Sequence, residues 1–125
     1  NPVAMAAGIA QLSECLKPGF YEGLEKNTTY LVHGIQNVNT FPLLKIFSLG
    51  SIFWLAFTNK ENISQSEDID PNSMTYFKTL YHALLEEGIY MGPSGYEVGF
   101  VSEAHSQNDL DQTISAFKNA LKKLA

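Results

Sequence analysis

The 125-residue sequence predicts an α+β fold, in which helices cover largely one face of a small antiparallel sheet. Two apolar segments, residues 43–49 and 52–58, are separated only by Gly50-Ser51, which is the spacing of a two-residue β-hairpin. Other segments carry apolar residues at intervals of three and four, which is typical of helices. The length supports one hydrophobic core, so we expect a single domain over residues 1–125.

The first two predicted helices lie at residues 1–16 and 19–38. Asn1 can cap the first helix, and Pro2 suits its first position because a proline there loses no needed backbone donor. Lys17-Pro18-Gly19 interrupts the pattern and separates the two helices. The apolar stripe of the first helix is Met5, Ile9, Leu12 and Leu16, and that of the second is Leu24, Thr28, Leu31, Ile35 and Val38.

The predicted hairpin spans residues 43–58, and its second strand reads Ile-Phe-Trp-Leu-Ala-Phe-Thr. Both faces of this strand are apolar, whereas a small antiparallel sheet normally turns one face to water. We therefore expect one of the two faces to meet a partner surface.

The second half of the chain predicts a polar loop at 59–73, a helix at 74–87 that stops at Gly88, and a short strand at 89–91. A segment rich in glycine follows as far as residue 105. The last predicted helix covers residues 107–124, and Ser106 with Asp109 three residues later resembles a capping pair. Its apolar positions are Leu110, Ile114, Phe117, Leu121 and Leu124.

Composition restricts the functions that the chain can have. The net charge of −5 argues against nucleic acid or an anionic membrane as a partner, and no apolar run is long enough to span a bilayer. All eight basic residues are lysines, so the residue that best grips carboxylates and phosphates is absent. Anion-gripping groups are therefore expected outside this sequence. Cys15 is the only cysteine, which excludes an intrachain disulfide and favours a reducing compartment.

The segment from Tyr90 to His105 concentrates the side chains that could do chemistry, and we call it the motif loop. Its sequence is Tyr-Met-Gly-Pro-Ser-Gly-Tyr-Glu-Val-Gly-Phe-Val-Ser-Glu-Ala-His. Three glycines and a proline predict a shaped loop between short extended pieces. Polar residues in such a loop are consistent with ordinary surface as well as with a site.

Two motifs in the sequence resemble one enzyme family. Gly-Pro-Ser-x-Tyr-Glu-x-x-Phe-x-Ser-x-Ala-His in the motif loop resembles the closing motif of glutamate-1-semialdehyde 2,1-aminomutases, which are class III pyridoxal-phosphate aminotransferases. Asn1-Pro2-Val-Ala-Met-Ala-Ala-Gly resembles the segment that follows the cofactor domain in the same enzymes. Residues 50–53 and 82–90 resemble two further blocks of these enzymes in the right order, so the resemblance covers essentially the whole chain.

The resemblance implies the C-terminal domain of a fold-type I enzyme, a cytoplasmic homodimer that makes 5-aminolevulinate for tetrapyrrole synthesis. The cofactor is pyridoxal phosphate or pyridoxamine phosphate, and the lysine that carries it would lie before Asn1. The resemblance therefore implies that this domain alone is inactive and that its partner is the N-terminal cofactor domain. It also implies that Glu97 faces the substrate, where a carboxylate could hold an ammonium or relay a proton. Ser94 could reach the same site or serve only as a turn residue, and Glu97 could be a surface carboxylate.

Other readings of the sequence remain open. A different class III aminotransferase would share the fold, and a binding module without catalysis would fit the incomplete catalytic set. His105 favours a structural hydrogen bond over catalysis, because no nucleophile partner can be assigned to it. Cys15 predicts a buried, inert thiol, and His33 and His82 lack metal-ligand spacing. The sequence indicates neither a metal site nor a phosphate loop.

Overall fold

The sheet is built on the predicted hairpin, which the computed structural model contains as β1 (Leu44–Leu49) and β2 (Ile52–Phe57). The structure describes residues 1–124, so only the last residue of the predicted domain lies outside it. Leu49 pairs directly with Ile52, and Gly50 has a φ of 57°. Ser51 does not have a positive φ. One left-handed residue at the first central position defines the glycine-first hairpin turn, so the predicted turn is confirmed.

The third strand is short and lies elsewhere than predicted. β3 (Gly99–Phe100) pairs antiparallel with β2 at Phe53 and Ile52. The predicted strand at residues 89–91 is wrong, because that segment has no strand partner. The backbone N–H of Ile89 instead donates to the carbonyl of Leu84 at 2.9 Å, which commits the start of the segment to closing the preceding helix.

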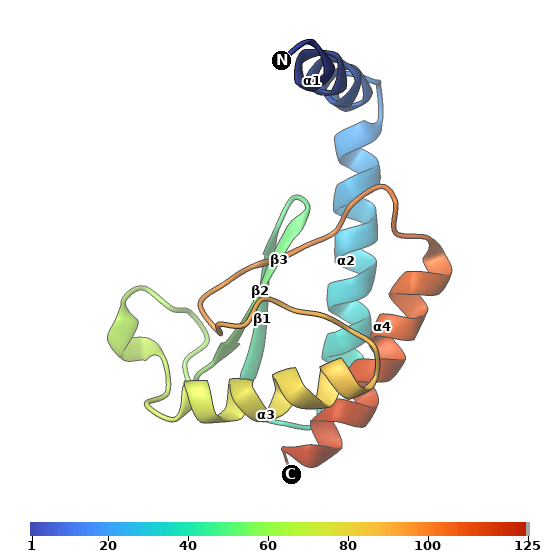
Figure 1. Ribbon diagram of the computed structural model, residues 1–125. Coiled ribbons are helices and arrows are strands. Elements are labelled where there is room, and N and C mark those ends of the chain that lie inside the picture. Colours follow the sequence, from blue (N-terminus) through green and yellow to red (C-terminus); the bar gives the residue numbers. More distant parts are fainter. Residues whose placement is uncertain (125) are drawn as a thin grey trace.

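Helices cover the inner face of the sheet, as predicted for an α+β fold. α2 (Phe20–Val38) and α4 (Gln107–Ala120) lie side by side against it, and α3 (Ser73–Glu86) crosses near its end (Figure 1). A short 3-10 turn, η2 (Leu121–Lys123), follows α4 where the sequence predicted continuous helix. The buried core joins the helices to the sheet through Leu31, Ile35, Leu44, Phe53, Leu55, Phe57, Phe77, Leu80, Leu84, Leu110, Phe117 and Leu121.

The helix ends follow the predicted signals. Gly88 has a φ of 83° and its N–H donates to the carbonyl of Leu85, so it terminates α3 in the left-handed conformation that glycine favours. Ser106 and Asp109 form a reciprocal capping box at the start of α4. The Asp109 N–H donates to the Ser106 hydroxyl at 3.3 Å, and the Ser106 N–H donates to the Asp109 carboxylate at 2.7 Å. Each side chain thus satisfies a donor that a helix start leaves free.

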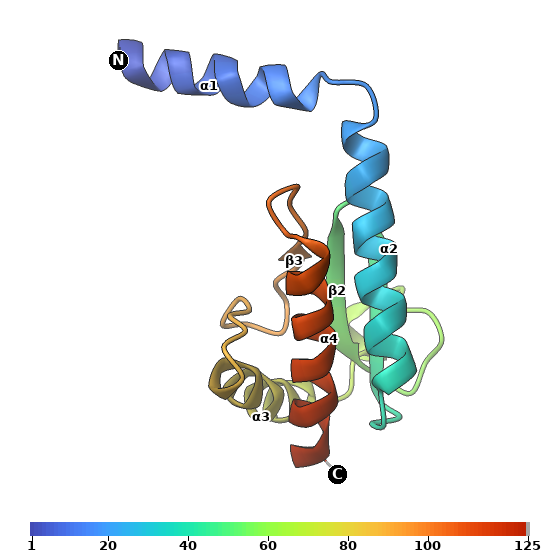
Figure 2. The ribbon, with the colours of Figure 1, turned by 90° about the vertical axis from the view of Figure 1, so that its right-hand side faces the viewer.

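The first helix, α1 (Pro2–Cys15), projects away from the rest of the molecule (Figure 2). The side chain of Asn1 caps it by accepting from the N–H of Val3 at 3.0 Å. None of its residues is buried, and its apolar side chains are mostly in water: Val3, Met5, Ile9 and Leu12, with Leu16 just beyond. A 14-residue helix is marginal in water without tertiary packing, so α1 has the character of an element that packs on another surface.

The segment predicted as an unstructured loop, residues 59–73, contains local structure. It includes the 3-10 turn η1 (Ser66–Asp68), and Ser73 already belongs to α3. The Asp68 carboxylate accepts from the N–H groups of Ser64 and Gln65. Such side chain-to-backbone bonds order a turn without any hydrophobic period, which is why the sequence pattern does not reveal it.

Residues 1–124 include no helix with both the length and the apolar character that crossing a lipid bilayer requires.

Candidate functional site: the motif loop

The motif loop is attached to the edge of the sheet by a tryptophan. The indole Nε1 of Trp54, on β2, donates a hydrogen bond to the carbonyl oxygen of Gly95 at 2.8 Å. Trp54 also packs its ring against Phe47 on β1, with ring centroids 6.0 Å apart. One of the two apolar faces of this strand was expected to meet a partner surface. The outer face is partly covered by this chain's own loop, because Trp54 is half-buried and Ala56 is buried.

Two of the three glycines of the motif loop, Gly95 and Gly99, are needed for space. None of the three has a positive φ, so a left-handed backbone is not the reason for them. A Cβ at Gly95 would lie 3.1 Å from the ring of Phe77, and a Cβ at Gly99 would lie 2.4 Å from the ring of Phe53. Both rings belong to the buried core, so these two glycines let the loop lie directly on it. Gly92 differs, because the side chain against it is that of Glu97.

Ser94 and Glu97 share one tight turn. The N–H of Glu97 donates to the Ser94 carbonyl at 3.0 Å, and the Ser94 hydroxyl accepts from the N–H of Tyr96 at 3.2 Å. The Ser94 side chain therefore stabilises the turn. Its other predicted role, a contact to the substrate, stays a proposal.

The side chain of Glu97 folds back across Gly92. A Cβ built on Gly92 would lie 2.0 Å from Oε2 of Glu97. Glu97 is exposed. Within residues 1–124, neither a hydrogen bond nor an ion pair holds its carboxylate. An exposed carboxylate at the end of a flexible side chain is free to turn toward a cationic group.

A second turn joins His105 to Ser102. The N–H of Ser102 donates to Nδ1 of His105 at 2.9 Å, and the Ser102 hydroxyl lies 3.2 Å from the same nitrogen. The N–H of His105 donates in turn to the carbonyl of Ser102. The structural hydrogen bond predicted for His105 is therefore confirmed. Because Nδ1 accepts a backbone N–H, the ring proton is on Nε2.

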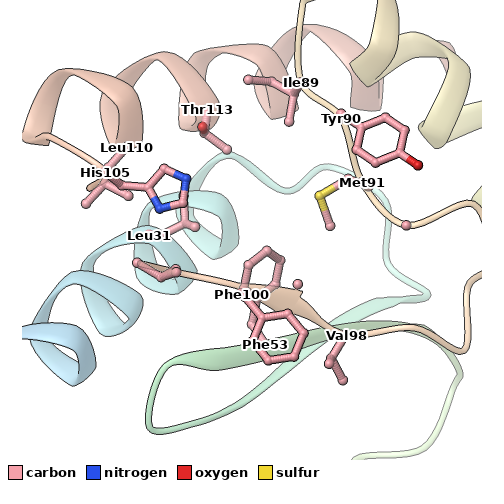
Figure 3. A pocket seen from close by; sticks show the side chains of 13 residues that line it. Leu31, Phe53, Ile89, Tyr90, Met91, Val98, Phe100, His105, Leu110 and Thr113 are labelled. Atoms are coloured by element: carbon pink, nitrogen blue, oxygen red, sulfur yellow. The ribbon is translucent and has the colours of Figure 1, made fainter. Parts of the chain in front are cut away.

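A pocket of about 240 Å³ lies between the motif loop, α2 and α4 (Figure 3). Its deep wall is apolar, and the imidazole of His105 faces into it (Figure 3). Among residues 1–124, no cysteine, serine or carboxylate side chain lines the pocket beside His105. The serine hydroxyl nearest the imidazole, that of Ser102, lies 3.2 Å from Nδ1 and outside the pocket lining.

The remaining candidate residues lie outside the motif loop. Cys15 is only partly buried, because α1 projects into solvent, so the prediction of a buried thiol is wrong. His33 and His82 are exposed on α2 and α3. Within residues 1–124, no cluster of three or more histidine, cysteine, aspartate or glutamate side chains could hold a metal ion.

The pocket residues do not fit pyridoxal phosphate. Its lining contains no lysine that could form a Schiff base and no cation that could neutralise a phosphate. This chain's own residues at the pocket therefore offer contacts to an apolar group and not a cofactor site.

Sequence reasoning missed two contributors to the site. Trp54 entered the sequence analysis only as an apolar residue of the predicted strand, while its bond to Gly95 anchors the loop. Thr113, on α4, lines the pocket together with His105. Both depend on contacts between residues far apart in the sequence, for which spacing along the chain gives no signal.

No family model matches the chain. Solved structures of transaminases, however, are similar over nearly its whole length. An omega-transaminase from Sphaerobacter thermophilus superposes with a TM-score of 0.81 and 21% identity, over 98% of this chain and 28% of that one. A transaminase with PLP bound has a TM-score of 0.75 and 25% identity, over 99% of this chain and 28% of that one. A thermostable (S)-enantioselective omega-transaminase from Thermomicrobium roseum has a TM-score of 0.71 and 17% identity, over 98% of this chain and 27% of that one.

This chain therefore has the fold of one segment of a transaminase, and it spans little more than a quarter of the length of these proteins. The α+β fold class predicted from the sequence is confirmed.

Proposed function

We propose that this chain is the C-terminal domain of a glutamate-1-semialdehyde 2,1-aminomutase, an isomerase that moves an amino group from carbon 2 to carbon 1. The observation that carries the proposal is the motif loop. Its Ser-x-Tyr-Glu sequence forms a hydrogen-bonded turn that leaves the carboxylate of Glu97 exposed and unpaired. The fold shared with transaminases supports the wider class.

In this proposal Glu97 is the catalytic residue that the domain contributes. Its carboxylate would hold the ammonium of the substrate or relay a proton at the nitrogen that moves. The loop on which it stands is fixed at Gly95 by Trp54 and rests on Phe77. The backbone below Glu97 is therefore held in place, while its side chain keeps the freedom to turn toward the substrate. The domain also closes the site and excludes water.

Pyridoxal or pyridoxamine phosphate would supply the amino-group chemistry from a cofactor domain that precedes this chain. The protein would be a cytoplasmic homodimer. The present residues supply neither the lysine nor the phosphate contacts at the pocket described above.

A second candidate is the corresponding domain of another class III aminotransferase. It is favoured by the solved structures, which are described as transaminases. A binding module without catalysis is a third, from a different class. The two enzymatic candidates differ in whether the amino group stays on the same molecule.

The test uses the complete protein encoded by the gene. The first step is to read the coding region before Asn1, where an in-frame cofactor domain is expected and where its lack would favour the binding module. The purified protein is then given glutamate 1-semialdehyde alone, and 5-aminolevulinate is measured. Formation of 5-aminolevulinate without an added amino acceptor supports the aminomutase. Turnover only when an amine and a keto acid are supplied together would assign the aminotransferase instead.

A further inference from the structure

The pocket beside His105 has the shape of a receptor for one apolar group. Its deep wall is made of side chains that are almost wholly shielded from water, among them Leu31, Phe53 and Leu110. A volume of about 240 Å³ exceeds the roughly 150 Å³ at which an apolar cavity takes up a benzene-sized group. The apolar side chains of this deep wall offer water no hydrogen-bond partner, so an apolar group is favoured there.

Polar side chains line the pocket at His105, Thr113 and the exposed rim residue Tyr90, and the first two define what else the occupant carries. Nδ1 of His105 is used by Ser102, so Nε2 carries the proton and is left as a donor. Figure 3 shows the imidazole directed into the pocket. The hydroxyl of Thr113 donates to the carbonyl of Asp109 at 2.8 Å, so toward the pocket it can only accept. No aspartate, glutamate, lysine or arginine lines the pocket among the described residues. The occupant is therefore uncharged and brings a hydrogen-bond acceptor.

The rim of the pocket argues for a polypeptide over a small molecule. Tyr90 and Phe100 line the pocket yet are 71% and 69% exposed. A benzene-sized ligand would leave most of these two aromatic surfaces in water, whereas a packed protein surface would cover them. α1, with its exposed apolar residues, projects toward the same side of the molecule as β3 and the loop before it (Figure 2).

We propose that this pocket receives an apolar side chain from the part of the protein that lies outside these 125 residues, and that Nε2 of His105 donates to a backbone carbonyl beside that side chain. The inference rests on the proposed function in one respect, namely that the complete protein has a further domain. The similar transaminases are long enough to contain such a domain, because this chain matches only 27% to 28% of their length.

The test measures the accessibility of His105 directly. Diethyl pyrocarbonate acylates the free nitrogen of neutral imidazoles, and peptide mass spectrometry assigns the label to each histidine. His33 and His82, both exposed on helices outside the pocket, are internal controls within the 125-residue chain. In the 125-residue chain we expect measurable labelling of His105, slower than that of the controls because its unprotonated nitrogen, Nδ1, already accepts from the N–H of Ser102. In the complete protein its rate relative to His33 should fall by about tenfold or more.

Three outcomes would overturn the proposal. Equal labelling of His105 in the chain and in the complete protein would mean that nothing from outside covers the pocket. Protection in the 125-residue chain that grows with protein concentration would assign the pocket to a second copy. Protection in that chain on addition of millimolar phenol, without protection in the complete protein, would assign it to a small molecule.

A variant provides a second measurement. Thr113→Trp places a large ring at the pocket, where it should keep the proposed side chain out. We therefore expect amide hydrogen exchange of residues 105–113 in the complete protein to become at least tenfold faster. Ser115→Trp is the matched control, because Ser115 is exposed on the same helix and lines the groove between α2 and α4. Equal behaviour of the two variants would contradict the proposal.

These results separate the inference from the proposed function. His105 labelling needs no turnover, so protection would stand even if the complete protein proved to be a different enzyme. Conversely, 5-aminolevulinate formation by a protein whose His105 is unprotected would support the proposed function and contradict the proposal that the pocket is occupied.

Discussion

The indole Nε1 of Trp54 and the carbonyl oxygen of Gly95 lie 2.8 Å apart, and this bond ties the motif loop to the edge of β2. The two residues are 41 positions apart in the sequence. Beyond Phe53, β3 no longer pairs with β2, so the loop takes over that edge through a side chain where a backbone ladder would otherwise continue. The position of Ser94 and Glu97 therefore depends on a residue of the sheet.

Replacing Trp54 by phenylalanine should loosen the motif loop while leaving the sheet intact. The variant keeps an aromatic ring against Phe47 but leaves the carbonyl of Gly95 without its donor. The expected loss in free energy of unfolding is about 1–2 kcal/mol, measured by urea denaturation. Hydrogen exchange of residues 93–98 should accelerate more than that of β1. Unchanged exchange in this segment would show that the bond does not hold the loop.

Gly99→Ala should destabilise the protein through a clash with the core. The new Cβ would lie 2.4 Å from the ring of Phe53, which is only 4% exposed and cannot move without disturbing its neighbours. Overpacking of this kind typically costs about 1–3 kcal/mol in free energy of unfolding. The matched control is Gly23→Ala in α2, where nothing lies within 4 Å of the new Cβ. The control should stabilise by about 0.5–1 kcal/mol, because alanine favours the helix.

Removal of residues 1–16 should leave the core unaffected. α1 has no buried residue, and its apolar side chains lie in water. We expect the free energy of unfolding to change by less than about 0.5 kcal/mol, and fluorescence of a bound hydrophobic dye to fall. Ile35→Ala, at a fully buried position of α2, is the contrasting control and should cost about 2–5 kcal/mol. A large loss of stability on deleting α1 would show that it packs on this chain.

The capping box of α4 makes stability depend on acid. Hydrogen bonds from the hydroxyl and then from the backbone N–H of Ser106 hold the pKa of Asp109 below its ordinary value of 3.8, and the nearby His105 acts in the same direction. A depressed carboxyl pKa contributes stability above the unfolded value, and that contribution is lost as the pH falls through the folded value. Asp109→Asn should therefore be less stable than the parent at pH 7, and the difference should shrink below about pH 4. Thermal unfolding at both pH values measures it, with Glu25→Gln, at an exposed position of α2, as the control.

The local parts of the fold could be predicted from the sequence, because they depend on neighbouring residues. Asn1 caps α1, Gly50 forms the hairpin turn, and Gly88 ends α3, each through a rule that involves residues a few positions apart. The third strand could not be located in this way. Gly99 pairs with Phe53 across the sheet, and only the close approach of the Phe53 ring explains why a glycine is needed there.

The candidate site shows the same division. The sequence marked Ser94, Glu97 and His105 as able residues, and the structure places them in two local turns. The pocket beside His105 depends on α2, α4 and β2 converging on the motif loop, which no spacing in the sequence reveals. Burial of Cys15 was wrongly predicted for a related reason, because an apolar helix pattern does not show whether the surface that covers the helix belongs to the same chain.

Glu97→Gln tests the role of the carboxylate in the complete enzyme. Glutamine keeps the length and much of the hydrogen bonding of the side chain but removes the charge, so folding and cofactor content should be retained. If the carboxylate holds an ammonium or relays a proton, turnover should fall about 10²-fold or more. Ser94→Ala should cost less, because its hydroxyl serves the turn by accepting from Tyr96, and water can replace such a contact. Formation of 5-aminolevulinate by the purified variants measures turnover, and visible absorbance checks cofactor loading. Wild-type turnover in Glu97→Gln would show that Glu97 is an ordinary surface carboxylate. The role of this domain would then be limited to covering the site.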